Sequence, residues 1–107
     1  MAREQLQTLS EPMYYILLAL IHPMHGYEIM HTVSKMTEGR LKVGAGTLYA
    51  LLARFESEGI VLQVGDDGRR KTYALTEKGR GLLDREYLRL KELVASFVKR
   101  VFLKEEM

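Results

Sequence analysis

The sequence predicts a mainly helical α+β fold built around one hydrophobic core. Three segments with apolar residues at helical spacing are followed by two short extended segments and then by one long helical pattern. With 107 residues, 47% of them hydrophobic and 28% charged, the chain has the size and composition of one globular domain. We divide it into a head, residues 1–75, and a C-terminal helix, residues 76–107.

The composition excludes several kinds of site. The chain has no cysteine, which excludes disulfides, thiolate zinc ligands and a cysteine nucleophile. Its longest apolar run, Met13 to Ile21, is about half a membrane span, and no signal-peptide pattern precedes it. We therefore expect a cytoplasmic protein that does not contact a membrane. A net charge of +2 is too small to indicate a nucleic-acid partner by itself.

The first two helices are bounded by residues that start or stop helices. The first helix should begin after Ser10, which is a capping residue, and end before Pro23. Because this helix is apolar all round, we expect it to be central and buried. The second should run from about Gly26 to Met36.

Residues 43–60, VGAGTLYALLARFESEGI, predict a third helix that ends at Gly59. The apolar positions at i, i+3, i+4 and i+7 are Leu48, Leu51, Leu52 and Phe55. Gly44 and Gly46 before this helix, with Asp66 about twenty residues later, imitate a dinucleotide-binding fingerprint. That interpretation fails because Tyr49 stands at the third glycine position and no further strand-helix units follow.

A β-hairpin should follow the third helix. Residues 60–64 and 69–75 are the extended segments, and Asp66-Asp67-Gly68 is the turn between them. Three helices followed by a hairpin is the order of a winged helix-turn-helix, in which the third helix enters the major groove of DNA. The cations Arg69, Arg70 and Lys71 would then stand on the wing beside that helix, where contacts with the DNA backbone are expected. The alternative is that they form only a solvated surface.

Thr76 can cap a last helix whose apolar residues repeat every seven positions. This stripe consists of Leu83, Tyr87, Leu90, Val94, Phe97 and Val101. The helix would be about 40 Å long, which exceeds what a small head needs. We therefore expect a dimerisation helix and a homodimer. Packing of the whole stripe within its own monomer is the alternative.

Four sequence motifs resemble the PadR family of bacterial transcriptional regulators in its short form, which has a single C-terminal helix. They are LLAL at 17–20, HGYEI at 25–29, GAGTLYALLARFESEGI at 44–60 and RRKTYALTEKG at 69–79. The chain departs from the family in having Ala50 where proline is frequent, and Thr72-Tyr73 where two aromatic residues are frequent.

The resemblance implies a winged helix homodimer that binds a two-fold-symmetric operator in double-stranded DNA. It would repress transcription until a small molecule or another signal releases it. The positions that the resemblance and the exposed face of the third helix assign to DNA are Tyr27, Thr47, Tyr49, Ala50, Arg54, Arg69, Arg70 and Lys71.

Other candidate sites are weaker. His22, His25 and His31 lie close in sequence, but without cysteine or evident carboxylate partners we expect no metal site. No hydrolytic motif occurs, so we expect neither an enzyme nor a cofactor. An apolar or aromatic effector could fit between the first and last helices of two subunits, against Met13, Tyr14, Leu17, Val94, Phe97 and Val98. The same residues could instead be plain dimer core.

A different class of function also fits the pattern. The heptad stripe and the charged hairpin could recruit a protein, so that the chain would be an interaction module without a role on DNA. The wing cations discriminate between the two classes, because a phosphate contact makes binding depend on salt.

Overall fold

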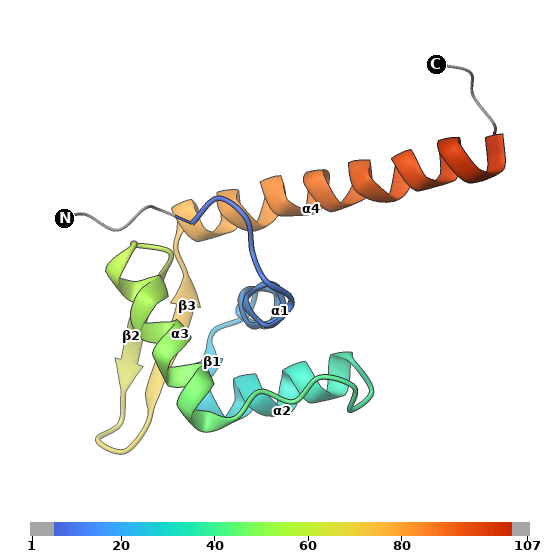
Figure 1. Cartoon of the computed structure of the whole chain (residues 1–107). Coiled ribbons are helices and arrows are strands. Elements are labelled where there is room, and N and C mark those ends of the chain that lie inside the picture. The colour runs from blue at the N-terminus through green and yellow to red at the C-terminus, as the bar shows by residue number, and fades with distance from the viewer. Residues whose placement is uncertain (1–5, 104–107) are drawn as a thin grey trace.

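The computed structural model describes residues 6–103 and shows a helical head with one long helix projecting from it (Figure 1). The elements in chain order are α1 (Glu11–Ala19), β1 (Met24–His25), α2 (Gly26–Met36), α3 (Ala45–Ser57), β2 (Val61–Asp66), β3 (Lys71–Leu75), α4 (Glu77–Val98) and a π-helical turn η1 (Lys99–Leu103).

Local capping signals set several helix ends. The Ser10 hydroxyl accepts a hydrogen bond from the Met13 amide and so caps α1, and Thr76 does the same for α4 through Gly79. Gly59 has a φ of 73°. The amides of Gly59 and Ile60 donate hydrogen bonds to carbonyls in the last turn of α3, and the helix ends there. These predicted ends are confirmed, although α1 stops at Ala19, a few residues before the proline that was expected to end it.

The sheet has three strands in the order β1-β3-β2, one more than the predicted hairpin. Met24 pairs with Tyr73 and His25 pairs with Thr72, so the connection before α2 adds a short antiparallel strand to the wing. Two residues are too few to show an alternating pattern, which is why β1 was missed. Between Gln63 and Gly65 the β2 register shifts by one residue, which is a β-bulge.

The core lies where α1, α2 and α3 meet the sheet and the first turns of α4. Its fully buried side chains include Ile16, Leu17, Leu20, Ile29, Val33, Leu48, Leu52 and Phe55. α1 is therefore central, as its composition predicts. Among the described residues no helix is both long and apolar enough to cross a membrane.

α4 belongs to the core only at its start. Gly79, Leu82, Leu83 and Glu86 are buried, whereas Val94 and Phe97 are 65% and 60% exposed. Leu83, which was predicted to begin the dimerisation stripe, thus packs inside its own chain. The start of α4 also packs on the head, so the chain is continuously packed across residue 76, where the head was expected to end. The rest of the helix extends away from the head (Figure 1).

Candidate nucleic-acid interface

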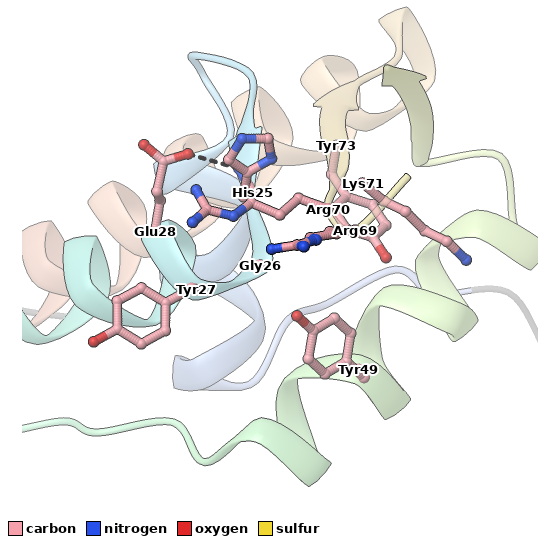
Figure 2. A pocket seen from close by; sticks show the side chains of 9 residues that line it. All are labelled: His25, Gly26, Tyr27, Glu28, Tyr49, Arg69, Arg70, Lys71 and Tyr73. Carbon is pink, nitrogen blue, oxygen red and sulfur yellow. Dashed lines mark hydrogen bonds between the residues drawn. The ribbon is translucent and has the colours of Figure 1, made fainter. Parts of the chain in front are cut away.

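The starts of α2 and α3 meet the wing around a cavity of about 510 Å³ (Figure 2). Its lining residues are His25, Gly26, Tyr27, Glu28, Tyr49, Arg69, Arg70, Lys71 and Tyr73. Five of the eight residues predicted to contact DNA are in this set. Thr47, Ala50 and Arg54 lie outside the lining, on α3.

Close packing of Tyr49 on Gly26 joins α3 to the start of α2. A Cβ atom at position 26 would overlap the Tyr49 hydroxyl, so the tyrosine ring would have to shift if a larger residue replaced glycine. Tyr49 remains 47% exposed, and Tyr27, the next residue along α2, is 76% exposed. The two tyrosines thus present their rings at the surface from neighbouring helices (Figure 2).

The tip of the wing holds three cations in the open. Asp67 Oδ1 accepts hydrogen bonds from the amides of Arg70 (2.9 Å) and Arg69 (3.2 Å), which fixes the turn. These bonds hold the pKa of Asp67 below its ordinary value. Arg69, Arg70 and Lys71 are exposed, and within residues 6–103 none of them forms an ion pair. Their charge is therefore directed to solvent.

The start of α3 is open and sterically small. Gly44 is the N-cap, and the first helical hydrogen bond runs from the Leu48 amide to the Gly44 carbonyl (2.9 Å). Helix geometry leaves the preceding amides without an intrahelical acceptor, at the positive end of the helix dipole. Thr47 and Ala50 are exposed on this turn, whereas Leu48 on the opposite side is buried. An anion could approach the backbone here.

Arg54 is engaged within the chain. Its Nε donates to Glu58 Oε2 at 2.9 Å, and its side chain is only 27% exposed. The sequence predicted Arg54 on the exposed side of the helix, but its guanidinium forms an ion pair with Glu58, four residues further along the helix. Arg54 is thus less available to DNA than the three wing cations.

Four residues of the cavity lining were not predicted as site residues, namely His25, Gly26, Glu28 and Tyr73. His25 Nδ1 lies 3.3 Å from the Thr72 hydroxyl, and the His25 amide donates to Glu28 at 2.9 Å (Figure 2). Tyr73 is buried beneath the wing. The HGYEI motif at 25–29 contains His25, Gly26 and Glu28 and was the signal that could have found them, whereas the position of Tyr73 depends on strand pairing. Among the described residues no cluster of three potential metal ligands occurs.

The predicted dimer and effector residues are spread over different environments. Tyr87, Val94, Phe97 and Val101 are exposed, and Leu90 is half-buried. Of the predicted effector residues, Met13 and Tyr14 are half-buried and Phe97 and Val98 are exposed, but Leu17 is completely buried in the core. A ligand could touch Leu17 only if the core opened.

Comparison with known proteins gives one consistent result. Residues 16–85 match the family described as "Transcriptional regulator PadR-like family". The structure resembles that of a transcriptional regulator from Clostridium thermocellum, Cth-833, with a TM-score of 0.67 and 26% identity over 83% of this chain and 90% of that one. It also resembles a PadR family transcriptional regulator from Eggerthella lenta, with a TM-score of 0.63 and 27% identity over 82% and 74% of the two chains.

A curated relative extends far beyond the matched region. The "37.1 kDa protein in transposon TN4556" of Streptomyces fradiae is 41% identical over 64 residues, which are 60% of this chain. This chain spans 18% of the length of that relative.

Proposed function

The chain belongs to the PadR-like family of transcriptional regulators, and from this premise we propose that it is a sequence-specific DNA-binding repressor acting as a homodimer on a two-fold-symmetric operator. The observation that carries the proposal is the convergence of the open start of α3 with three exposed wing cations on one face of the head (Figure 2). In the part of the chain that the structure describes, residues 6–103, these cations form no ion pair.

In the proposed complex α3 enters the major groove. The small exposed side chains of Ala50 and Ala53 let the helix axis approach the base edges, and the hydroxyls of Thr47 and Tyr49 reach a base or a phosphate near the helix start. The unpaired amides at residues 45–47 face a phosphate at the positive end of the helix.

The wing and Tyr27 act on the DNA backbone in this proposal. Arg69, Arg70 and Lys71 neutralise phosphates that flank the groove, and each such contact makes binding weaker at higher salt. Tyr27, which lines the cavity and is 76% exposed, donates its hydroxyl to a phosphate. Arg54 takes a supporting role, because its guanidinium already binds Glu58.

Dimerisation is assigned to the exposed part of the α4 stripe, from Tyr87 to Val101. These apolar side chains lie beyond the head, where the described chain offers no partner surface. A second copy supplies the same stripe, and a two-fold dimer pairs the two. Two recognition helices would then lie about one duplex turn apart on the operator.

In the proposed mechanism a signal releases the protein from its operator. An apolar or aromatic molecule bound between Met13, Tyr14, Phe97 and Val98 of two subunits would change the relative position of the heads. It would act only if it bound the two arrangements with different affinity.

Fluorescence anisotropy with a labelled duplex from the promoter of the chain's own gene tests the proposal. We expect tighter binding than to a scrambled duplex, and weaker binding as salt rises. Arg70→Ala should reduce the salt slope by about one while affecting both duplexes similarly. Arg80→Ala removes the same charge from α4, away from the wing tip, and should leave the slope unchanged.

Two results would contradict the proposal. An unchanged slope for Arg70→Ala would remove that phosphate contact. No binding to either duplex at low salt would favour the interaction module that the exposed α4 stripe also fits.

A further inference from the structure

The segment before α1, residues 6–9, is held by two carboxylates from different helices. The Leu6 amide donates to Glu58 Oε1 at 2.9 Å, and the Leu9 amide donates to Glu86 Oε2 at 2.5 Å. Glu58 is the C-cap of α3, and Glu86 lies in α4. This segment, which we call the strap, runs along the first turns of α4 before it reaches α1 (Figure 1).

Glu86 is an unusual residue to bury. It is 1% exposed, and Arg89 donates to it through Nε (2.7 Å) and a terminal nitrogen (2.9 Å). Burying a paired charge is costly, and an apolar side chain could fill the same volume. The strap supplies a reason for the carboxylate, because the Leu9 amide would otherwise lose its acceptor.

Glu58 connects three elements. Its carboxylate accepts from Arg54 of α3 (2.9 Å) and from the Leu6 amide of the strap (2.9 Å). Its carbonyl accepts from Lys78 Nζ of α4 (2.7 Å). The end of α3 is thus fastened to both the strap and α4.

The strap supplies a second attachment point for α4. The first is the contact of Gly79 with the Ile60 carbonyl, which is so close that a Cβ atom would overlap the oxygen. Glu86 lies seven residues further, about 10 Å along the helix. Together with the buried Leu82 and Leu83, two separated contacts restrict the direction of the helix more than the first contact does alone.

The side of α4 near the strap is not tightly filled. A cavity of about 390 Å³ is lined by Leu6 and Gln7 of the strap together with Ile60, Lys78 and Arg85. Leu6 and Leu9 pack against the core as partly buried side chains, and the space beside them leaves the strap room to shift that a close-packed surface would not. The hydrogen bonds to Glu58 and Glu86 therefore add to the packing of Leu82 and Leu83 in holding the direction of α4.

We propose that the strap sets the angle between α3 and α4, with Glu58 and Glu86 as positioning residues for operator binding. The inference rests on the proposed dimer. Because α4 carries the dimer contact and α3 enters the groove, a small rotation of α4 changes the separation of the two recognition helices. That separation must match half-sites one duplex turn apart.

Pulsed electron paramagnetic resonance can measure this separation directly. The chain has no cysteine, so Ser57→Cys gives one spin label at the exposed end of each α3. We expect a narrow distance distribution between labels in the otherwise unchanged chain. Glu86→Gln, and separately deletion of residues 1–9, should broaden it. The matched control is Asp84→Asn, which breaks an exposed α4 ion pair that does not touch the strap.

Binding of the promoter duplex provides the functional measurement. Glu86→Gln should weaken binding to the promoter about tenfold, within the usual range of coupling between sites, while binding to the scrambled duplex at low salt stays the same. In the chain lacking residues 1–9, the same substitution should have no further effect. A variant that merely unfolds would lose both kinds of binding.

The outcomes separate failure of the strap from failure of the dimer. Unchanged narrow distances in both the Glu86→Gln and deletion variants would overturn the strap proposal. Additive losses of promoter binding would also overturn it. Absence of any dipolar signal between labels in the parent chain would instead refute the dimer on which the proposal rests.

Discussion

The two halves of α4 have the same apolar spacing but different surroundings. The first half buries Leu82 and Leu83 in the head, whereas the second half leaves Leu93, Val94 and Phe97 more than half exposed. A seven-residue repeat shows that a helix has an apolar stripe, but not whether the partner is its own chain or another. Leu83, predicted as a dimer residue, lies where the buried face and the exposed stripe meet and is buried within its own chain.

The comparison can be tested through the free energy of unfolding of the single chain. First-half substitutions should lower it, and second-half substitutions should act mainly on association. The expected loss in the free energy of unfolding decreases from Gly79→Ala through Leu83→Ala and Glu86→Gln to Val94→Glu.

Gly79→Ala should have the largest effect. Its Cβ would overlap the Ile60 carbonyl, and a backbone atom cannot move aside as a flexible side chain can. We expect a loss of at least about 3 kcal/mol, measured by urea denaturation. Gly81→Ala is the matched control, because its Cβ would meet only the Arg85 guanidinium at 3.4 Å. Gly81→Ala should be neutral or stabilising. Equal losses of free energy of unfolding in the two variants would contradict the close contact of Gly79 with the Ile60 carbonyl.

Leu83→Ala should cost about 2 to 5 kcal/mol, because it leaves a cavity in the head. The loss should be the same at low and high protein concentration, since the residue packs within its own chain. The denaturation midpoint at several concentrations checks this. If the loss of stability appeared only at concentrations where the chain associates, Leu83 would instead be part of the dimer contact.

Glu86→Gln should cost about 2 kcal/mol at neutral pH, because the Leu9 amide and Arg89 lose a charged acceptor. The hydrogen bonds from Arg89, with a smaller contribution from Leu9, hold the pKa of Glu86 below its ordinary value of 4.5 despite burial. Its stabilising contribution is therefore present above pH 4.5 and is lost as the pH falls through the lower folded pKa.

A pH series of urea titrations from pH 7 to pH 3 tests this dependence. The difference between the parent chain and Glu86→Gln should shrink toward the acidic end. If the difference in free energy of unfolding between the two chains did not change with pH, the charge of Glu86 would not be the source of its stabilising effect.

Val94→Glu should have the smallest effect on the single chain, within about 0.5 kcal/mol, because the side chain is 65% exposed. It should nevertheless produce monomers in sedimentation velocity, since two carboxylates would face each other in the seam, and promoter binding should weaken. Val94→Ile, which keeps the stripe apolar, is the control. A Val94→Glu chain that stays dimeric would place the seam elsewhere.

Local signals predicted the elements well. The helix ends at Ser10, Gly59 and Thr76 depend on contacts within a few residues along the chain. They could therefore be predicted from the local sequence. The order of helices and hairpin predicted the winged helix, and the family match supports it. Strand β1 escaped prediction because its pairing partners lie about 50 residues away in the chain.

Much of the candidate site was also accessible to sequence reasoning. The wing cations and the exposed start of α3 follow from periodicity and turn chemistry. The close contact at Gly26 does not, because it involves a tyrosine on another helix. The capture of Arg54 by Glu58 was open to an i, i+4 argument, but the role of Glu58 in holding the strap was not.

The sequence by itself determined which residues form helices, where the chain turns, and that an apolar stripe and a basic wing exist. Those properties depend on backbone conformation and side-chain periodicity over short stretches. Only the tertiary structure decided which part of the stripe the head covers, which cations of the described residues are exposed, and why a carboxylate is buried at Glu86. These are contacts between segments distant in the chain, and their energies depend on geometry that no local pattern contains.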